Sequence, residues 1–170
     1  MNIKRNERDW AGQLISWIKS AIEKGATIFQ DATNDTGVKM ESGKTKYPDI
    51  LLFTDKASGI IFNGWELKFP DTAVDDTTML ENALEKAKKL QSDSFVTWNG
   101  AQAVIWKINT GDYTIETLTK IKEYPKNVSI SMMQRPSKQI CMPILKKQKP
   151  LIIRLYSNLT LRMTLIIRIL

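Results

Sequence analysis

Hydrophobic residues recur with helical spacing near the start of the chain. Between Asn6 and Lys24 they follow a period of 3.6 residues, which predicts an amphipathic helix that ends near Gly25. The apolar stripe consists of Trp10, Ala11, Leu14, Ile15, Trp17, Ile18, Ala21 and Ile22. Glu7 falls close to the centre of this stripe, whereas Glu23 falls on the solvent-facing side. Glu7 is therefore either a buried carboxylate that needs a cation or a first-turn residue favoured by the helix dipole.

The pattern then changes from helical spacing to two apolar runs separated by a turn. Residues 31–46 are rich in Asp, Thr, Asn, Gly and Lys, which predicts a loop. The run Tyr47–Thr54 predicts a strand, Asp55–Gly59 has turn chemistry, and Ile60–Phe69 predicts the return strand. Because side chains alternate along a strand, Trp65 and Glu66 should face opposite sides of the sheet.

A second helix and further strands follow the predicted hairpin. The helix runs from Asp75 to about Asp93, with Lys86, Lys88 and Lys89 on faces other than its apolar stripe. The stripe consists of Met79, Leu80, Ala83, Leu84, Ala87 and Leu90. The segments 94–98 and 101–108 supply one or two more strands. The order of elements predicts an α/β fold with a mixed central sheet of about four strands flanked by helices.

Charge divides the chain into two parts. The formal net charge is +7, yet residues 1–123 hold all 18 acidic residues and have a net charge of −2, whereas residues 124–170 hold no acid and nine Lys or Arg. Val128 is the only Val, Ala, Asp, Glu or Gly after residue 123. These five residue types have codons that begin with G, so we hypothesise that translation leaves its frame near residues 124–131. A basic nucleic-acid-binding arm and a basic amphipathic membrane helix over 151–170 are the alternatives.

The composition narrows the chemistry that residues 1–123, the predicted domain, can perform. The chain has no histidine, which excludes Ser-His-Asp triads and zinc sites built on histidine. Its single cysteine, Cys141, cannot form an intramolecular disulfide. The charged N-terminus lacks the apolar run of a signal peptide, and three arginines within 151–170 argue against a spanning helix. We therefore expect a cytoplasmic protein that is not embedded in a membrane.

The candidate chemistry lies in the hairpin. Asp49 begins the first strand, and Glu66 and Lys68 lie two residues apart on the second, so both should emerge on one face. Two carboxylates held close together repel each other, and a divalent metal relieves that repulsion. Mg²⁺ prefers oxygen ligands, so Asp49, Glu66 and the backbone carbonyl of Leu67 form a suitable set. Lys68 would orient or help deprotonate the attacking water, or stabilise charge in the transition state.

Other interpretations of these residues are open. Asp49 can be a strand-end turn residue, and Glu66 with Lys68 can be an exposed charge pair across strands. Lys44 and Lys46 precede the first strand and are either phosphate contacts or part of a solvated loop.

The sequence Pro48-Asp49, followed after sixteen residues by Glu66-Leu67-Lys68, resembles the motif of the PD-(D/E)xK nuclease superfamily. The resemblance implies a restriction-endonuclease-like core and hydrolysis of DNA phosphodiester bonds with Mg²⁺, for which Mn²⁺ can substitute. It assigns metal binding to Asp49 and Glu66 and catalysis to Lys68. In many members an acid on the leading helix joins the site, which favours Glu7 as the fourth site residue.

Four segments make the resemblance more specific. NERDWAGQLISWI, YPDILLF, WELKFP and SFVTWNGAQAVIWKI are similar to the nuclease module that opens bacterial restriction enzymes with a fused adenine methyltransferase. The likeness covers roughly residues 5–120. It implies double-stranded DNA as the substrate, a homodimer on DNA as one way to cut both strands, and downstream methyltransferase and target-recognition regions as partners.

The sequence is compatible with two other functions. The chain could be a structure-selective nuclease that acts on junctions or damaged DNA. It could also be an inactive remnant that only binds metal or DNA.

Overall fold

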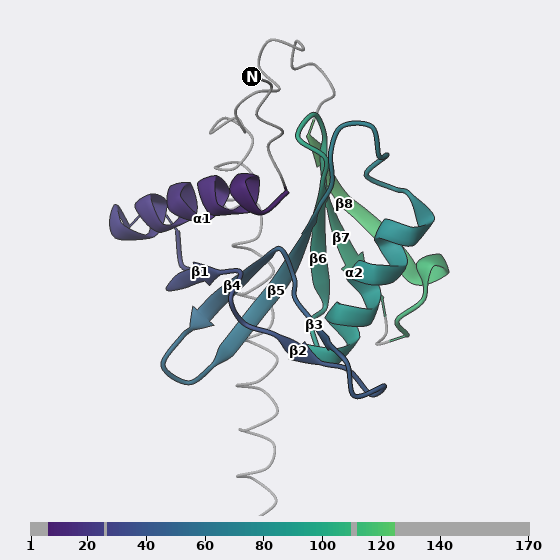
Figure 1. Ribbon diagram of the computed structural model, residues 1–170, viewed down its shortest axis with the longest axis horizontal. Coiled ribbons are helices and arrows are strands. Elements are labelled where there is room, and N and C mark those ends of the chain that lie inside the picture. The colour runs from purple at the N-terminus through teal and green to yellow at the C-terminus, as the bar shows by residue number, and fades with distance from the viewer. Residues whose placement is uncertain (1–6, 26, 110–111, 125–170) are drawn as a thin grey trace, which may run out of the picture.

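The computed structural model describes residues 7–25, 27–109 and 112–124. The central feature is a six-stranded sheet in the order β1-β4-β5-β6-β7-β8, in which only β5 and β6 run parallel (Figure 1). Two short strands, β2 and β3, form a separate hairpin. The elements are α1 (Glu7–Glu23), β1 (Asp31–Thr33), β2 (Val38–Lys39), β3 (Thr45–Lys46), β4 (Ile50–Asp55), β5 (Ile60–Leu67), α2 (Thr77–Lys89), β6 (Ser94–Trp98), β7 (Ala103–Ile108), the 3₁₀ turn η1 (Ile115–Thr117) and β8 (Leu118–Tyr124).

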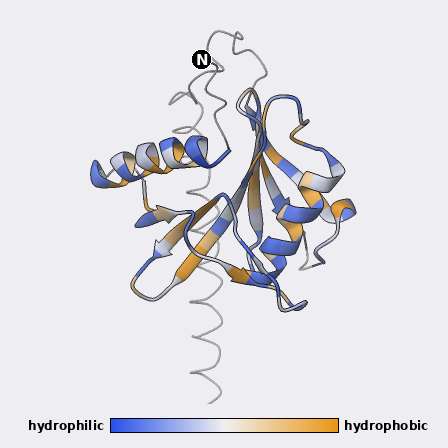
Figure 2. Ribbon diagram, in the orientation of Figure 1, coloured by the Kyte–Doolittle hydropathy of each residue, from blue (hydrophilic) through white to orange (hydrophobic). Residues whose placement is uncertain are grey.

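The two helices cover opposite faces of the sheet. Trp65, Val96 and Ile105 face α1, whereas Phe95 and Val104, from the alternate positions of the same region, face α2. Figure 2 shows hydrophobic positions along the central strands and hydrophilic ones over the outer surfaces of the helices. The α/β class and the mixed sheet flanked by helices are therefore confirmed.

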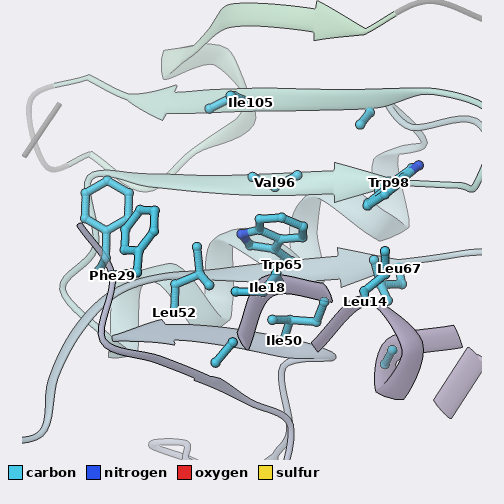
Figure 3. Close-up of a cluster of buried hydrophobic side chains, with 14 of the residues drawn as sticks. Leu14, Ile18, Phe29, Ile50, Leu52, Trp65, Leu67, Val96, Trp98 and Ile105 are labelled. Carbon is cyan, nitrogen blue, oxygen red and sulfur yellow. The ribbon is translucent and has the colours of Figure 1, made fainter. Parts of the chain in front are cut away.

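The core beneath α1 is the larger of the two hydrophobic clusters. Leu14 and Ile18 of α1 are completely buried and lie among large side chains from the sheet (Figure 3). Trp98 packs edge-on against Trp10 and lies 6.2 Å, centroid to centroid, from Trp65. Because Trp65 points into this core, it fixes which side of the sheet each β5 side chain occupies. The residues on either side of Trp65 in the strand therefore point away from α1.

The predicted helices and hairpin strands are confirmed, with shifted ends. The first helix begins at Glu7 among the described residues, and Glu23 is exposed as expected. The second helix starts after Asp76, whose side chain accepts a hydrogen bond from the Met79 N–H at 3.0 Å and caps the helix. The segments 94–98 and 101–108 form two strands, β6 and β7.

The number of strands was underestimated. The sheet has six strands rather than about four, because β1 lies inside the predicted loop 31–46 and β8 was not predicted. The β2–β3 hairpin also lies in that predicted loop. Both missed sheet strands are edge strands. β1 has only three residues and β8 is largely exposed, so neither has the apolar run that identified the central strands.

Among the described residues, neither helix is long and apolar enough to cross a bilayer. Apart from Tyr124, the predicted tail 124–170 lies outside these residues, as do Val128, Cys141 and the segment 151–170. The interpretations of the tail therefore stay predictions.

Candidate functional site

Asp49 and Glu66 lie opposite each other at one end of the β4–β5 hairpin. The strands pair in antiparallel register up to Ile50 opposite Trp65, and one further step along both strands places Asp49 opposite Glu66. The Leu67 N–H donates a hydrogen bond to Asp49 Oδ2 at 2.8 Å. The backbone of the second strand thus holds the carboxylate of the first in place.

Glu66 faces α2 and is almost completely buried. Its neighbours in the strand, Trp65 and Leu67, belong to the core beneath α1, so alternation turns Glu66 toward the other face, as predicted. There the Lys86 ammonium of α2 lies 2.5 Å from Glu66 Oε2. The exposed fractions of the two side chains are only 10% for Lys86 and 8% for Glu66. The pair is therefore an ion pair largely removed from solvent.

Lys68 follows the last residue of β5 and contacts the other helix. Its ammonium donates to both carboxylate oxygens of Glu7, at 3.2 and 3.4 Å. Glu7 is the first residue of α1, so the helix start is brought to the end of the hairpin across 61 residues of sequence. Glu66 and Lys68, which we expected on one face, contact different helices, although the charge of each acts on the other. The Lys68 N–H donates to the Trp98 carbonyl at 2.9 Å, so the backbone at this residue is still hydrogen-bonded to β6.

The pKa values show that the two carboxylates are costly to ionise. Burial raises the pKa of Asp49, and the Leu67 N–H and the lysine charges offset this only in part. Burial likewise raises the pKa of Glu66 despite the nearby Lys86 ammonium, and the charge of Asp49 raises it further. Bringing a cation to the pair would oppose both effects.

At Lys68, the neighbouring charges outweigh the effect of burial on the pKa. Burial lowers the pKa of its ammonium, but the adjacent Glu7 carboxylate, with Glu66 and Asp49, outweighs burial and leaves the pKa raised. Lys68 is therefore charged at neutral pH. Its charge acts on both Asp49 and Glu66, so these four residues and Lys86 form one electrostatically coupled group.

Lys44 and Lys46, the predicted phosphate contacts, have different surroundings. Lys44 is exposed in the turn between β2 and β3. The Lys46 ammonium forms an ion pair with Glu85 of α2 and donates to Asn82 Oδ1 at 3.2 Å. Lys46 is thus partly neutralised, whereas Lys44 is exposed to solvent.

Lys86 was predicted wrongly to lie on an outer face of its helix. It is buried on the inner face with Met79, which it follows by seven residues, and two helical turns contain about 7.2 residues, so the two positions share a side of the helix. That spacing was the available signal, and the charge of the side chain concealed it. Lys88 and Lys89 are exposed, as predicted.

The described residues do not group three or more His, Cys, Asp or Glu side chains closely enough to hold a metal ion. Protein ligands for a cation would therefore be the two carboxylates and backbone oxygen, with water or phosphate completing the shell. Each carboxylate is fixed through one oxygen, and no described residue donates a hydrogen bond to the other oxygen, Asp49 Oδ1 or Glu66 Oε1.

A larger hollow of about 490 Å³ lies elsewhere, between the loop after β5, the β6–β7 turn and β8. Its charged lining comprises Asp71, Asp75, Glu123 and Lys120. This excess of acids is unsuited to phosphate, so the carboxylate pair remains the better candidate site.

No family model and no curated protein matches the chain. A cryo-electron microscopy structure of a DrdV–DNA complex resembles it with a TM-score of 0.42 and 11% sequence identity. The likeness covers 75% of this chain and 13% of that chain. The functional assignment therefore rests on the side chains described above.

Proposed function

We propose that this protein hydrolyses DNA phosphodiester bonds with a divalent cation, Mg²⁺ or Mn²⁺, held by Asp49 and Glu66. The observation that carries the proposal is the arrangement of these two carboxylates, which face each other at the hairpin end and whose pKa values are both raised by burial. Paired, partly desolvated carboxylates beside a lysine are characteristic of a functional site rather than a stabilising surface pair.

The donor set fits a hard divalent cation. Both side chains offer carboxylate oxygen, and each keeps one oxygen that accepts no hydrogen bond from the described residues. The Leu67 carbonyl is the expected backbone ligand. When bound, the cation supplies positive charge to the phosphate oxygens and lowers the pKa of water.

Lys68 would stabilise negative charge on the reacting phosphate. Its raised pKa favours this role over that of a base, because an ammonium that stays protonated has no free electron pair to accept a proton. Glu7 acts through Lys68: its carboxylate holds the ammonium at 3.2 Å and favours the charged form. Glu7 is thus a positioning residue in this proposal.

Double-stranded DNA is the proposed substrate, and a restriction–modification enzyme is the proposed context. Residues 1–123 have a net charge of −2, and phosphate neutralisation drives most DNA binding. We therefore expect these residues alone to bind DNA weakly. Lys44, exposed in the β2–β3 turn, is the proposed phosphate contact, and additional domains or subunits would supply the rest of the affinity.

A second candidate is an inactive protein that retains the nuclease fold. The Lys86–Glu66 pair favours it, because a buried lysine already neutralises one of the two carboxylates. The two candidates differ in whether the site turns over DNA.

The test is cleavage of supercoiled plasmid by the full 170-residue chain with Mg²⁺, Mn²⁺ or EDTA. We expect metal-dependent nicking that falls by about 100-fold or more in both Asp49→Asn and Lys68→Met. The exposed residues Glu81 and Lys88 provide matched controls, Glu81→Gln and Lys88→Met, which should retain the activity. Metal-independent cleavage, or equal cleavage by all variants, would contradict the proposal. Folded wild-type protein without cleavage would favour the inactive candidate.

A further inference from the structure

Lys86 is a buried cation that the proposed hydrolysis does not use. It lies on α2 with 10% of its side chain exposed, and its ammonium is 2.5 Å from Glu66 Oε2. Lysine is almost never buried unless it is paired, because removing its charge from water is costly. The same helix carries Lys88 and Lys89 at exposed positions. Position 86 therefore has a different role from the lysines on the outer surface of α2.

The surroundings of Lys86 leave it little freedom beside Glu66. The two residues line a cavity of about 10 Å³ between the hairpin and α2. A cavity of that size is at the lower limit for one water molecule. The remaining walls are Pro48, Gly64, Trp65, Ala83, Ala87 and Phe95. A hydrated cation therefore cannot enter on this side of Glu66 while the ammonium occupies it.

The charge of the Lys86 ammonium also opposes binding of a cation. Lys86 acts on Asp49 as well as on Glu66, so one ammonium serves both members of the carboxylate pair. A divalent cation bound between those carboxylates would be held by the same charges and repelled by the ammonium. At short range in a partly buried site this repulsion is strong, since water screens it poorly.

We propose that Lys86 is a built-in counter-ion that competes with a divalent cation for the Asp49–Glu66 pair. The proposal rests on the proposed function for the identity of the competing cation. The ammonium keeps the metal-free carboxylates together, and it weakens metal binding in return. The site is therefore stable without metal and binds Mg²⁺ only at higher concentrations than the two carboxylates alone would require.

Direct titration of the full chain with Mg²⁺ or Mn²⁺ by isothermal calorimetry tests this competition. Lys86→Met removes the charge and keeps the apolar bulk, and we expect it to bind the cation about tenfold more tightly or better. Lys89→Met, the exposed control on the same helix, should bind within about twofold of wild type. The gain should disappear in Lys86→Met combined with Glu66→Gln, because the contested carboxylate is then absent.

A spectroscopic readout follows the ammonium itself. The nitrogen-15 resonance of the Lys86 ammonium, assigned by its absence in Lys86→Met, should shift during Mg²⁺ titration, whereas that of Lys89 should not. If Lys86→Met does not fold, Lys86→Gln offers a smaller polar replacement without charge, and it should tighten cation binding in the same direction.

Unchanged or weaker cation binding by folded Lys86→Met would overturn the proposal and would indicate that Lys86 supports the metal site or is independent of it. This result could coexist with metal-dependent plasmid cleavage, so the proposed function would stand. Conversely, tighter cation binding by Lys86→Met without DNA cleavage by any variant would support the role of Lys86 as a counter-ion. The same result would contradict the proposed hydrolysis of DNA.

Discussion

Two carboxylate clusters in this molecule use lysine in opposite ways. Asp31 on β1 forms ion pairs with Lys56 and, at 3.4 Å, with Lys19. Burial alone would raise its pKa, but the hydrogen bond from Lys56 and the charge of Lys19 outweigh burial and lower the pKa. At the hairpin end, burial outweighs the lysines, and the pKa values of Asp49 and Glu66 are raised.

The difference separates a stabilising charge cluster at Asp31 from the cluster that we propose to be functional. At Asp31 one acid is matched by two largely exposed lysines, so ionisation favours folding. At the hairpin end, two acids share a buried region and ionisation opposes folding. An arrangement that costs stability at the end of two strands is expected of a site built for a ligand, and the ligand that we propose here is a cation.

The largest expected effect comes from breaking the buried pair from one side. Lys86→Met leaves the Glu66 carboxylate buried beside Asp49 without its counter-charge, and we expect the free energy of unfolding to fall by about 3–5 kcal/mol. Urea denaturation measures this loss. Combining Lys86→Met with Glu66→Gln should restore most of it, since both members of the ion pair are then absent. If the single substitution leaves stability unchanged, the two side chains do not form a buried ion pair in solution.

The next effect is stabilisation of the metal-free protein by a cation. A ligand present at 100 times its dissociation constant stabilises the folded state by about 2.7 kcal/mol, so Mg²⁺ should raise the melting temperature in a saturable manner. Asp49→Asn should lose this response, and Asp31→Asn should retain it. Equal responses in both variants would remove the contrast between the clusters.

A smaller effect is expected at the stabilising cluster. Asp31→Asn removes two ion pairs whose lysines are mostly exposed, so solvent screening limits the loss to about 1 kcal/mol at neutral pH. Because the folded-state pKa of Asp31 lies below its ordinary value of 3.8, its contribution is complete above that pH and disappears as the pH falls through the folded-state pKa. Chemical denaturation of the wild type and Asp31→Asn from pH 7 to pH 3 measures how the difference between their free energies of unfolding decreases.

The smallest expected effect is a gain in stability rather than a loss. The folded-state pKa of Asp49 lies above 3.8, so between these values the folded protein binds more protons than the unfolded chain. The metal-free wild type therefore loses stability as the pH rises through this window, and Asp49→Asn does not. We expect Asp49→Asn to exceed the wild type by less than about 1 kcal/mol at pH 7 in EDTA. A variant that is less stable than wild type at that pH would show that Asp49 stabilises the fold.

Much of the hairpin could be predicted from local pattern. The apolar runs around a five-residue turn predicted both strands, and alternation predicted that Trp65 and Glu66 face opposite sides. The contact between Glu7 and Lys68 joins residues 61 positions apart and depends on how α1 packs across the sheet. Only the family resemblance, not the helix pattern, favoured Glu7 as a site residue.

The missed features depend on tertiary contacts that a local pattern does not encode. Lys86 occupies an inner position of α2, but a lysine there is stable only because Glu66 from β5 meets it. The edge strand β8 gains its hydrogen bonds from β7 while most of its side chains remain in water, so its sequence lacks an apolar run.

The most direct test of the account is to locate a cation by anomalous diffraction from crystals of the full chain grown with Mn²⁺. We expect an anomalous peak at coordination distance from both Asp49 and Glu66, absent from crystals of Asp49→Asn. A peak at Asp31 with none between Asp49 and Glu66, or an unchanged peak in Asp49→Asn, would contradict the assignment of this carboxylate pair as the metal site.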